Sequence, residues 1–276
     1  MRRLMLAGAM YARIILIAAL AFHARPGAAA DKPATGAPGS TLRVGIATNY
    51  PPLAFKQDGQ IKGVEADFAA LVGKNLDVTV TLVETPWEDL IPALQKGQID
   101  VIMSGMSITA ERKKLVSFTT PYTTVSQMAL YRSADANRFR KLAGLDAKTV
   151  RVGVVGGTTG EQYARKNHPH VQVKEFASVD DGVAALRKGD IDIFVHDAPA
   201  IWRVTGGFDS PERELTGYYE PLTEEHLAWA VRKNESALRV RLNSLLSKWK
   251  ASGQIEAVLD RWITVRKQLI HPRPKS

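Results

Sequence analysis

The sequence predicts an α/β protein built from two similar units, each a parallel sheet flanked by helices. The first observation is an internal repeat, in which residues 93–101 (ALQKGQIDV) recur as residues 185–193 (ALRKGDIDI). Each copy is typical of a helix end, a glycine that terminates the helix, and a short apolar strand. The two halves also open alike, with RVGI at residues 43–46 and RVGV at residues 151–154. Alternating strands and helices of this kind form parallel sheets covered by helices.

Each half contains a second strand between its opening and its close. A helix and a strand are predicted at residues 63–75 and 78–83 in the first half, and at 161–166 and 171–176 in the second. Each half therefore has the order strand, helix, strand, helix, strand.

The segments around the second half predict a hinge. Residues 123–131 (TTVSQMALY) are typical of an extended crossing, and residues 227–231 (LAWAV) with an amphipathic helix near 236–250 can return to the first unit. We therefore expect residues 41–125 and 222–264 to form a discontinuous lobe 1, and residues 126–221 to form lobe 2. Two linking segments between two lobes are the arrangement of a hinge.

Composition excludes several classes of protein. The chain has 276 residues, 45% hydrophobic residues and no cysteine, which fits a globular protein and excludes disulfides, cysteine nucleophiles and cysteine-ligated metals. The formal charge of +9 includes four arginines and no acid in the first thirty residues, so the remainder carries +5, with 33 basic against 28 acidic residues. A charge of +5 without a basic, aromatic-interleaved stripe does not favour a nucleic-acid partner.

The first thirty residues are typical of a secretory signal peptide. A basic start at Arg2 and Arg3 precedes the apolar residues 14–22, and three alanines end at Ala30. A membrane anchor would need roughly 20 apolar residues, so we expect cleavage after Ala30 and a periplasmic protein. Residues 31–40 (DKPATGAPGS) are typical of a flexible leader. The basic residues 265–276 contain two prolines and are expected to fray.

Polar and aromatic residues follow four predicted strands. Ligands of parallel α/β sheets bind beyond the carboxyl ends of the strands, so these loops define a candidate site. The candidates are Tyr50, Phe55, Ser104, Gly105, Ser107, Arg112, Thr158, Thr159 and Asp197, with Trp87 from the segment 85–90.

The loops together are complementary to a zwitterion. Arg112 can bind a carboxylate through two parallel hydrogen bonds, and the glycine-rich residues 156–160 lie between a strand and a helix, where backbone N–H groups favour the same anion. Asp197, from the other half, can accept from an ammonium group. Tyr50, Phe55 and Trp87 offer flat apolar walls.

Each candidate also has a purely structural interpretation. Arg112 lies in the sequence ERKK, which is typical of a solvated helix face. Trp87 could pack at a helix start, and Asp197 could cap the helix that follows it. The glycine-rich loop lacks the first glycine of a dinucleotide fingerprint and the lysine of a P-loop, so alone it predicts a tight turn.

Several segments together resemble the polar amino-acid substrate-binding proteins of ABC importers (bacterial extracellular solute-binding proteins, family 3). The resemblance covers roughly residues 41–264 and is carried by YPP at 50–52, GVEAD at 63–67, WEDLIPAL at 87–94, SGMSITAER at 104–112, FTTPY at 118–122, GTT at 157–159 and Asp197.

The resemblance implies a two-lobed, type II-like Venus-flytrap fold that closes on one amino acid and passes it to an inner-membrane ABC permease. It implies that Arg112 holds the α-carboxylate with Ser107 and Thr159. It also implies that Asp197 and the segment Ser104–Gly105 hold the α-ammonium, while Tyr50 and Trp87 sandwich the side chain. No cofactor or metal is expected, and we expect a monomer.

Two departures from the family pattern bear on the ligand. Relatives that bind basic side chains carry an acid where this chain has Ala47, and a glutamine where it has Gly160. The resemblance therefore argues against lysine, arginine or ornithine, and leaves neutral or acidic amino acids, or a non-standard ligand, open.

An enzyme is the main alternative function. Periplasmic cyclohexadienyl dehydratase resembles these binding proteins and uses a carboxylic acid in the cleft as its general acid, for which Glu161 is the candidate here. A glutamate in the first turn of a helix is also favoured by the helix dipole alone. The pair His168 and His170 suggests a metal site, but it lacks a third ligand at suitable spacing.

Overall fold

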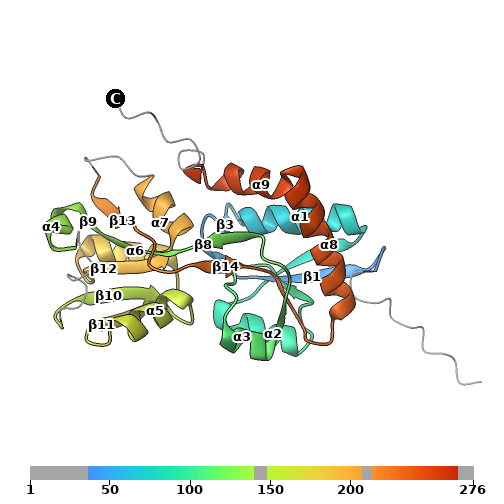
Figure 1. The fold of residues 1–276 in the computed structure, drawn as a ribbon, viewed down its shortest axis with the longest axis horizontal. Helices are drawn as coiled ribbons and strands as arrows, with labels where there is room; N and C mark the ends of the chain where they lie inside the picture. Colours follow the sequence, from blue (N-terminus) through green and yellow to red (C-terminus); the bar gives the residue numbers. More distant parts are fainter. Residues whose placement is uncertain (1–36, 140–147, 207–212, 267–276) are drawn as a thin grey trace, which may run out of the picture. The chain divides into compact units, whose positions relative to one another are not determined.

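The computed structural model describes residues 37–139, 148–206 and 213–266, and Figure 1 labels their helices and strands. The predicted signal peptide, most of the predicted leader and nearly all of the basic tail lie outside these residues. In the described ranges, no helix is both long and apolar enough to cross a membrane.

The first sheet combines strands from the two ends of the described chain. Its order is β5-β1-β6-β15-β7, in which β1, β5 and β6 are parallel and β15 is antiparallel to β6 and β7. The bounds are β1 (Thr41–Ile46), β5 (Thr79–Glu84), β6 (Val101–Ile102), β7 (Ser117–Phe118) and β15 (Ala230–Val231).

The second sheet is built from the middle of the chain. Its order is β11-β10-β12-β9-β13, with β10, β11 and β12 parallel and with β9 antiparallel to both β12 and β13. The bounds are β9 (Gln127–Arg132), β10 (Arg151–Val155), β11 (Gln172–Phe176), β12 (Ile193–Asp197) and β13 (Leu215–Tyr218). The antiparallel strands, β9 and β15, overlap the predicted extended segments 123–131 and 227–231, but their antiparallel pairing was not predicted.

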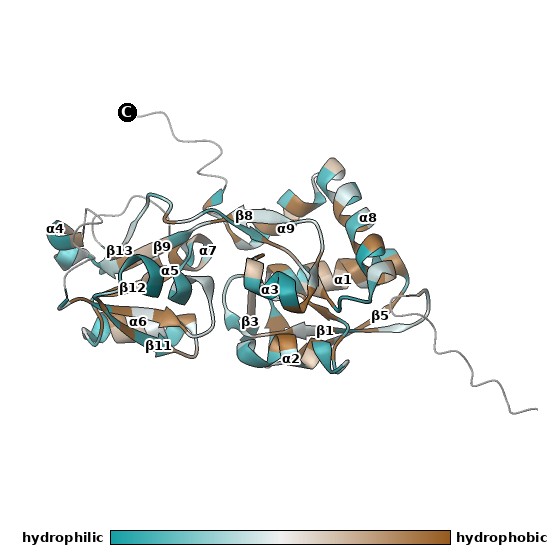
Figure 2. Cartoon of the chain, turned by 60° about the horizontal axis from the view of Figure 1, so that its bottom comes forward, coloured by the Kyte–Doolittle hydropathy of each residue, from teal (hydrophilic) through white to brown (hydrophobic). Residues whose placement is uncertain are grey.

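The predicted repeat is present as β1-α1-β5-α2-β6 in the first sheet and β10-α5-β11-α6-β12 in the second. Helices α3 and α5 are coloured mostly hydrophilic in Figure 2. The helices of the repeat are α1 (Val64–Leu76), α2 (Leu90–Gln95), α5 (Thr159–Asn167) and α6 (Val179–Lys188). The predicted α/β fold with two sheet-based lobes is therefore confirmed.

Equivalent ion pairs close both repeats. Arg43 donates to Asp100 from its backbone N (2.9 Å) and its guanidinium (2.7 Å), and Arg151 donates to Asp192 in the same way (2.9 and 2.8 Å). Each pair joins the first strand of a repeat to the residue directly before its closing strand. The sequence repeat therefore preserves a specific bidentate interaction as well as a hydrophobic pattern.

A second arginine supports each of these acids from outside the repeat. Arg232, which follows β15, donates to the carbonyl oxygen of Ile99 at 2.8 Å, and Arg132, at the end of β9, donates to that of Ile191 at 2.7 Å. Each also lies 3.5 Å from the acid of its repeat. The antiparallel strands are thus fixed to the repeats by equivalent contacts.

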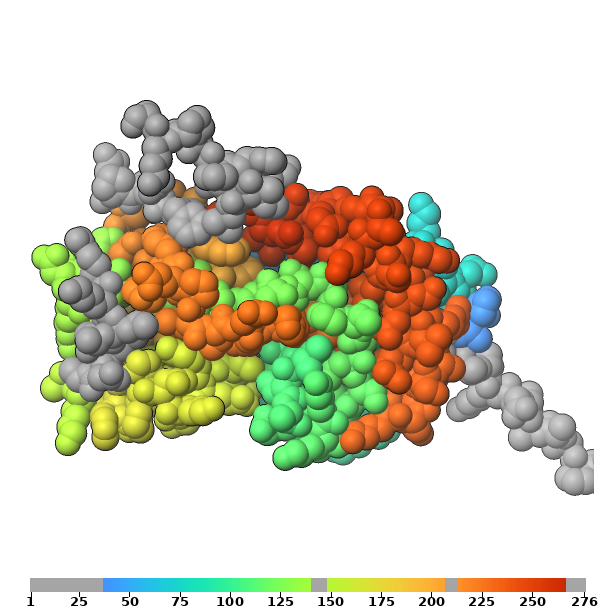
Figure 3. Space-filling view, viewed as in Figure 1, coloured from blue at the N-terminus to red at the C-terminus, as the bar shows by residue number. Residues whose placement is uncertain are grey.

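Two antiparallel strands, β8 (Thr123–Val125) and β14 (Glu225–Leu227), carry the chain between the lobes. They are part of the green and orange segments that cross the middle of Figure 3. The sequence predicted one strand over residues 227–231, but the structure divides this region into β14 in the crossing and β15 in the first sheet. The division follows from the two different partners of these strands, β8 and β6.

The remaining elements cover the sheets or form the edges of the cleft. In the first lobe, α1 and α8 contact each other through the stacked rings of Phe68 and Trp249, whose centroids are 6.0 Å apart. The other elements are β2 (Asn49–Tyr50), β3 (Ala54–Gln57), β4 (Gln60–Lys62), η1 (Trp87–Asp89), α3 (Ala110–Leu115), η2 (Ser133–Asp135), α4 (Ala136–Phe139), α7 (Ala198–Thr205), α8 (Ser236–Ser252) and α9 (Gln254–Trp262).

The equivalence of the two ion pairs can be tested with Asp100→Asn and Asp192→Asn. Burial by itself raises the pKa of each carboxyl group, but hydrogen bonds from Arg43 or Arg151 outweigh it and lower the pKa. We expect each variant to lose about 3 kcal/mol of unfolding free energy at pH 7, measured by urea denaturation.

The sign of the pH dependence follows from the lowered pKa. The stabilisation is complete above the unfolded pKa of about 3.9 and is lost as the pH falls through the folded pKa. The difference between wild type and either variant should therefore shrink in strong acid, and a difference that is independent of pH would contradict this interpretation.

Candidate functional site

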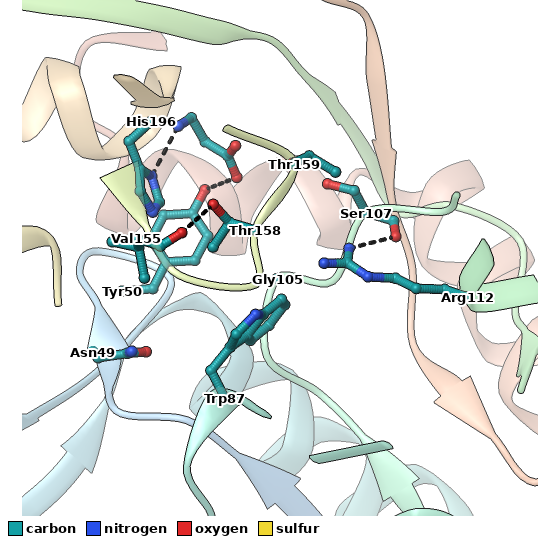
Figure 4. Close-up of a pocket in the computed structure, with 11 residues that line it drawn as sticks. Asn49, Tyr50, Trp87, Gly105, Ser107, Arg112, Val155, Thr158, Thr159 and His196 are labelled. Atoms are coloured by element: carbon teal, nitrogen blue, oxygen red, sulfur yellow. Dashed lines mark hydrogen bonds between the residues drawn. The ribbon is translucent and has the colours of Figure 1, made fainter. Parts of the chain in front are cut away.

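The loops after the strands of both sheets enclose a small inner pocket, next to a larger outer cavity of about 600 Å³ that shares Asn49, Trp87 and Val155 with it. The volume of the inner pocket is about 20 Å³, which is room for about one water molecule. Figure 4 shows the lining side chains directed from several loops toward a common space. The lining residues are Asn49, Tyr50, Trp87, Gly105, Ser107, Arg112, Val155, Thr158, Thr159, His196 and Asp197.

Arg112 is a buried cation, with 8% of its surface exposed. Thr109 caps α3 by accepting from the backbone N of Arg112 (3.1 Å), which fixes the start of the helix. The guanidinium donates to the carbonyl oxygens of Ser107 (2.9 Å) and Gly157 (3.1 Å) and lies 5.1 Å from the centre of the Trp87 ring.

Burial lowers the pKa of Arg112, against the opposing charges of Glu225 and Asp197. The interpretation as a solvated helix face is therefore wrong.

No carboxylate in the described part of the chain forms an ion pair with Arg112. A buried guanidinium that donates only to neutral carbonyl oxygens retains a strong preference for an anion. The geometry can therefore bind a carboxylate in the pocket.

Asp197 is a buried acid on the other side of the pocket, at the end of β12. Tyr50 donates its hydroxyl to Oδ2 of Asp197 at 2.5 Å, and the amide of Gln127 donates to Oδ1. Burial first, and then the charge of Glu225, raise the pKa of Asp197 to about 7. Although Asp197 is the N-cap residue of α7, its side chain makes no capping hydrogen bond. The capping interpretation is therefore wrong.

His196 contributes a neutral ring beside this acid. Burial lowers its pKa to about 3, and its Nδ1 accepts from the backbone N of Asp197 at 2.8 Å. Its ring meets the edge of Tyr50, with the centroids 4.8 Å apart. The ring therefore supports Tyr50 and adds no charge to the pocket.

Glu65 fixes the backbone of Gly105 from beneath the pocket. It is fully buried and accepts from the backbone N of Gly105 (2.6 Å), the hydroxyl of Tyr122 (2.8 Å) and Nε1 of Trp229 (3.0 Å). Burial raises its pKa to about 7, against these three hydrogen bonds. Gly105 has φ of +65°, and a Cβ there would lie 2.8 Å from the ring of Tyr50. Only glycine fits this turn.

The loop before α5 brings the second lobe to the first. The carbonyl oxygen of Gly157 accepts from Nε1 of Trp87 (3.1 Å) as well as from Arg112. Thr158 caps α5, because its Oγ1 accepts from the backbone N of Glu161 (3.4 Å) and donates to the carbonyl oxygen of Val155 (2.7 Å). The helix N-terminus is thus held against the pocket.

Glu161 does not line the pocket. It accepts from the backbone N of Gly157 (2.8 Å) and from Nε of Arg165 (2.7 Å). Burial acts to raise its pKa, but these partners outweigh burial and lower the pKa. A carboxylate with a lowered pKa is a poor proton donor near neutral pH.

Two other predicted residues lie elsewhere. Phe55 packs against Trp262, with ring centroids 5.7 Å apart, and does not line the pocket. Ser104 is buried and does not line the pocket, and its hydroxyl accepts from the backbone N of Ala47 at 3.0 Å. The structure brings the other eight predicted residues together around the pocket.

Sequence reasoning missed several residues of the site. Gln127, at the start of β9, contacts Asp197, and Glu225, on β14, contacts Ser107. Asn49 and His196 line the pocket itself. Asn49 and His196 directly precede the predicted site residues Tyr50 and Asp197, and this adjacency could have identified them. For Gln127 and Glu225, the sequence offered only the position of an acid just before the apolar residues 227–231.

Two α/β lobes joined by two crossing strands place a buried cation from one lobe and a buried acid from the other around one pocket. The chain belongs to the bacterial extracellular solute-binding proteins, family 3, whose profile matches residues 42–265. The family prediction and the type II-like two-lobed fold are therefore confirmed, and with them the class of amino-acid ABC-transporter substrate-binding proteins.

Relatives with different ligands share this fold. ABC transporter arginine-binding protein 1 of Escherichia coli K12 is 30% identical over 258 residues, covering 91% of this chain and 98% of that protein. The L-cystine-binding protein TcyJ of the same organism is 30% identical over 223 residues, covering 80% and 82%. The crystal structure of the ancestral amino acid-binding protein AncCDT-1, described as a precursor of cyclohexadienyl dehydratase, has a TM-score of 0.75 and 33% identity, covering 81% of this chain and 95% of that one.

The buried carboxylate of Glu65 can be tested with Glu65→Gln. The amide can accept at only one of its two positions, so its NH₂ group would face the indole N–H of Trp229. We expect unfolding free energy to fall by about 1–3 kcal/mol at pH 8 in urea denaturation. Glu256→Gln, on the exposed surface of α9, is the control and should be neutral. Equal stability of the two variants would contradict the proposed role of Glu65.

Proposed function

We propose that this protein captures one zwitterionic amino acid between its lobes and delivers it to an inner-membrane ABC permease. The observation that carries the proposal is the placement of Arg112 and Asp197, a buried cation without an ion pair and a buried acid, on different lobes around one pocket. A zwitterion is the simplest ligand that satisfies both groups.

The α-carboxylate binds Arg112, with help from Ser107 and Thr159, which line the same pocket. The α-ammonium binds Asp197 near the Gly105 segment, and Tyr50 and Trp87 flank the side chain. Removing a partner of such a buried, hydrogen-bonded charge costs about 2–5 kcal/mol of binding.

Closure of the hinge accompanies capture. In this proposal residues 41–125 and 222–264 move as lobe 1 and residues 126–221 as lobe 2. Because the pocket has room for about one water molecule, an amino acid enters only after the lobes part. Contacts across the cleft, such as Asn49 to the carbonyl oxygen of Ala177 (2.7 Å), then re-form around it. A ligand with contacts on both lobes shifts the population toward the closed form.

The ligand has a neutral or acidic side chain in this proposal. Ala47 offers no charge behind the pocket, and two acids of the larger outer cavity, Glu84 and Glu175, are already paired. Glu84 accepts from Lys56 and Thr48 at 2.6 Å each, and Glu175 accepts from Arg165 at 2.5 Å. A basic side chain would compete with these partners for the carboxylates.

The protein works in the periplasm after removal of residues 1–30, and it acts as a monomer. The extracellular character of the family supports the compartment. N-terminal sequencing of the exported protein should begin at Asp31.

We also propose that the protein performs no reaction. Glu161, the acid considered for a dehydratase, is paired with Arg165 outside the pocket. Glu161→Gln keeps an acceptor for Gly157, so we expect ligand affinity to change by less than about threefold. A larger loss would place Glu161 in the binding cleft.

Calorimetric titration of refolded protein (residues 31–276) with the twenty amino acids tests the function. Stoichiometric binding of one neutral or acidic amino acid is expected, and preferred binding of lysine, arginine or ornithine would overturn the side-chain assignment. Prephenate and arogenate are assayed in parallel by absorbance. Turnover of either compound would make the protein an enzyme.

Arg112→Ala should lose about 2–5 kcal/mol of binding free energy for the amino acid that wild type binds, because the carboxylate loses its only buried cation in the described pocket. Lys113→Ala, an exposed neighbour on α3, is the matched control. Unchanged affinity in Arg112→Ala would exclude carboxylate recognition at this residue.

A further inference from the structure

The amide of Gln127 joins two carboxylates beside the pocket. Its Nε2 donates to Oδ1 of Asp197 and lies 3.1 Å from Oε1 of Glu225 and 3.2 Å from Oγ1 of Thr159. Gln127 itself is buried, with 1% of its surface exposed. Two acids from different segments, β12 and the hinge strand β14, therefore share one nitrogen donor.

The side-chain amide of Gln127 has too few hydrogens to donate to all three oxygen atoms around its nitrogen. An NH₂ group has two hydrogens and no net charge, whereas three oxygen atoms surround this one. On the other side of the amide, Oε1 of Gln127 is buried and has no hydrogen-bond partner among the described residues. Two carboxylates around one nitrogen would bind an ammonium group, with three hydrogens and a full charge, more strongly.

The other hydrogen bonds of Glu225 hold its carboxylate beside the pocket. Its Oε2 accepts from the hydroxyl of Ser107 at 2.6 Å, and its Oε1 accepts from Oγ1 of Thr223 at 2.9 Å. Ser107 lines the pocket, and Asp197 and Thr159 line it as well. Every hydrogen-bond partner of Nε2 of Gln127 except Glu225 thus lines the pocket, and Glu225 is linked to the lining through its hydrogen bond with Ser107.

We propose that Glu225 is a specificity-determining residue that, together with Asp197, forms a two-carboxylate site for the ammonium group of the ligand. In this structure the Gln127 amide bridges the two acids, and it gives up this position when the ammonium group binds. Gly160 leaves the space for this movement, since a Cβ there would lie 2.8 Å from Oε1 of Gln127. The inference rests on the proposed capture of a zwitterion and identifies the second half of its ammonium site.

The charges around the pair predict a proton linkage. Asp197 faces Tyr50 from β2, Gln127 from β9, Glu225 from β14 and Arg112 from α3, and it adjoins the neutral ring of His196. The field of Asp197 also reaches Tyr122. Since Arg112 is the one cation among these groups, two ionised acids leave an excess negative charge. Burial, followed by the charge of Glu225, raises the pKa of Asp197 to about 7, so Asp197 holds a proton below that pH.

Binding of an ammonium group should release this proton. The ligand requires the ionised pair, and its affinity should therefore fall as the pH drops below about 7. Glu225→Gln removes the second charge, so the pH at which affinity falls should move lower. A residue with a merely structural role would not move this midpoint.

The experiment compares wild type, Glu225→Gln and Glu224→Gln in calorimetric titrations with the twenty L-amino acids. Glu224 is the neighbouring, exposed acid, with 79% of its side chain exposed, and its variant is the matched control. At pH 8 we expect Glu225→Gln to weaken binding by about tenfold or more, and Glu224→Gln to change it by less than about twofold. The 2-hydroxy acid counterparts, such as L-lactate for L-alanine, should bind both variants equally poorly.

Calorimetric titrations at pH 6 are run in phosphate and in a buffer with a large ionisation enthalpy. The difference between the two observed binding enthalpies gives the number of protons released per bound ligand. Wild type should release close to one proton per bound amino acid, and Glu225→Gln clearly fewer. Glu225→Asp keeps the charge, so it should keep the release even if its affinity falls or its stability is reduced.

The outcomes separate the two proposals. Silence of wild type with all twenty amino acids overturns the proposed function, and this inference with it. Binding by wild type, with Glu225→Gln equal to Glu224→Gln in affinity and proton release, overturns the inference alone. Loss of affinity with unchanged proton release makes Glu225 a support for Ser107 and also overturns its role as an ammonium ligand.

Discussion

The buried charge of Arg112 is the constraint on which the site depends. Its guanidinium is held by carbonyl oxygens from both lobes, those of Ser107 and Gly157, so the closed arrangement already uses the cation as a contact across the cleft. Neutral oxygens stabilise a buried cation less than a carboxylate does. The same contact that closes the cleft in this structure therefore leaves a binding preference for an anion. Recognition and closure depend on one side chain.

The acid that balances Arg112 is controlled from the hinge. Asp197 contacts Gln127 at the start of β9, and through that amide it is linked to Glu225 on β14. Both residues lie at or next to the two strands that cross between the lobes. A change in the charge of Asp197 thus alters hydrogen bonds in or next to the two strands that link the lobes. The chemistry of the pocket and the mechanics of the hinge share these contacts.

The fold was accessible from the sequence because the repeat encodes it locally. The paired motifs place Asp100 and Asp192 opposite Arg43 and Arg151, and each pair forms within one repeat of the order strand, helix, strand, helix, strand. The antiparallel strands were not accessible in the same way. Strand β15 pairs with β6 across more than a hundred residues of intervening chain, and the direction of such a strand depends on the path of the hinge.

The lining of the pocket was predictable where its residues follow parallel strands. Arg112 and Asp197 were found because strand ends gather at one edge of each sheet. Phe55 failed because one turn of β2–β3 directs it toward Trp262, which lies about two hundred positions later in the sequence. Glu161, the candidate acid of the alternative enzyme, lies at the helix start and is paired with Arg165, as the structural interpretation of a first-turn glutamate implies.

Glu65 shows why buried support is harder to infer than ligand contact. Its sequence neighbourhood is that of an amphipathic helix, in which a glutamate normally faces solvent, yet it is fully buried. Only the tertiary approach of Gly105, Tyr122 and Trp229 supplies the three donors that make burial of a carboxylate tolerable. The position of the Gly105 turn, and with it the wall of the pocket under Tyr50, therefore depends on an acid whose role is defined entirely by residues distant in the sequence.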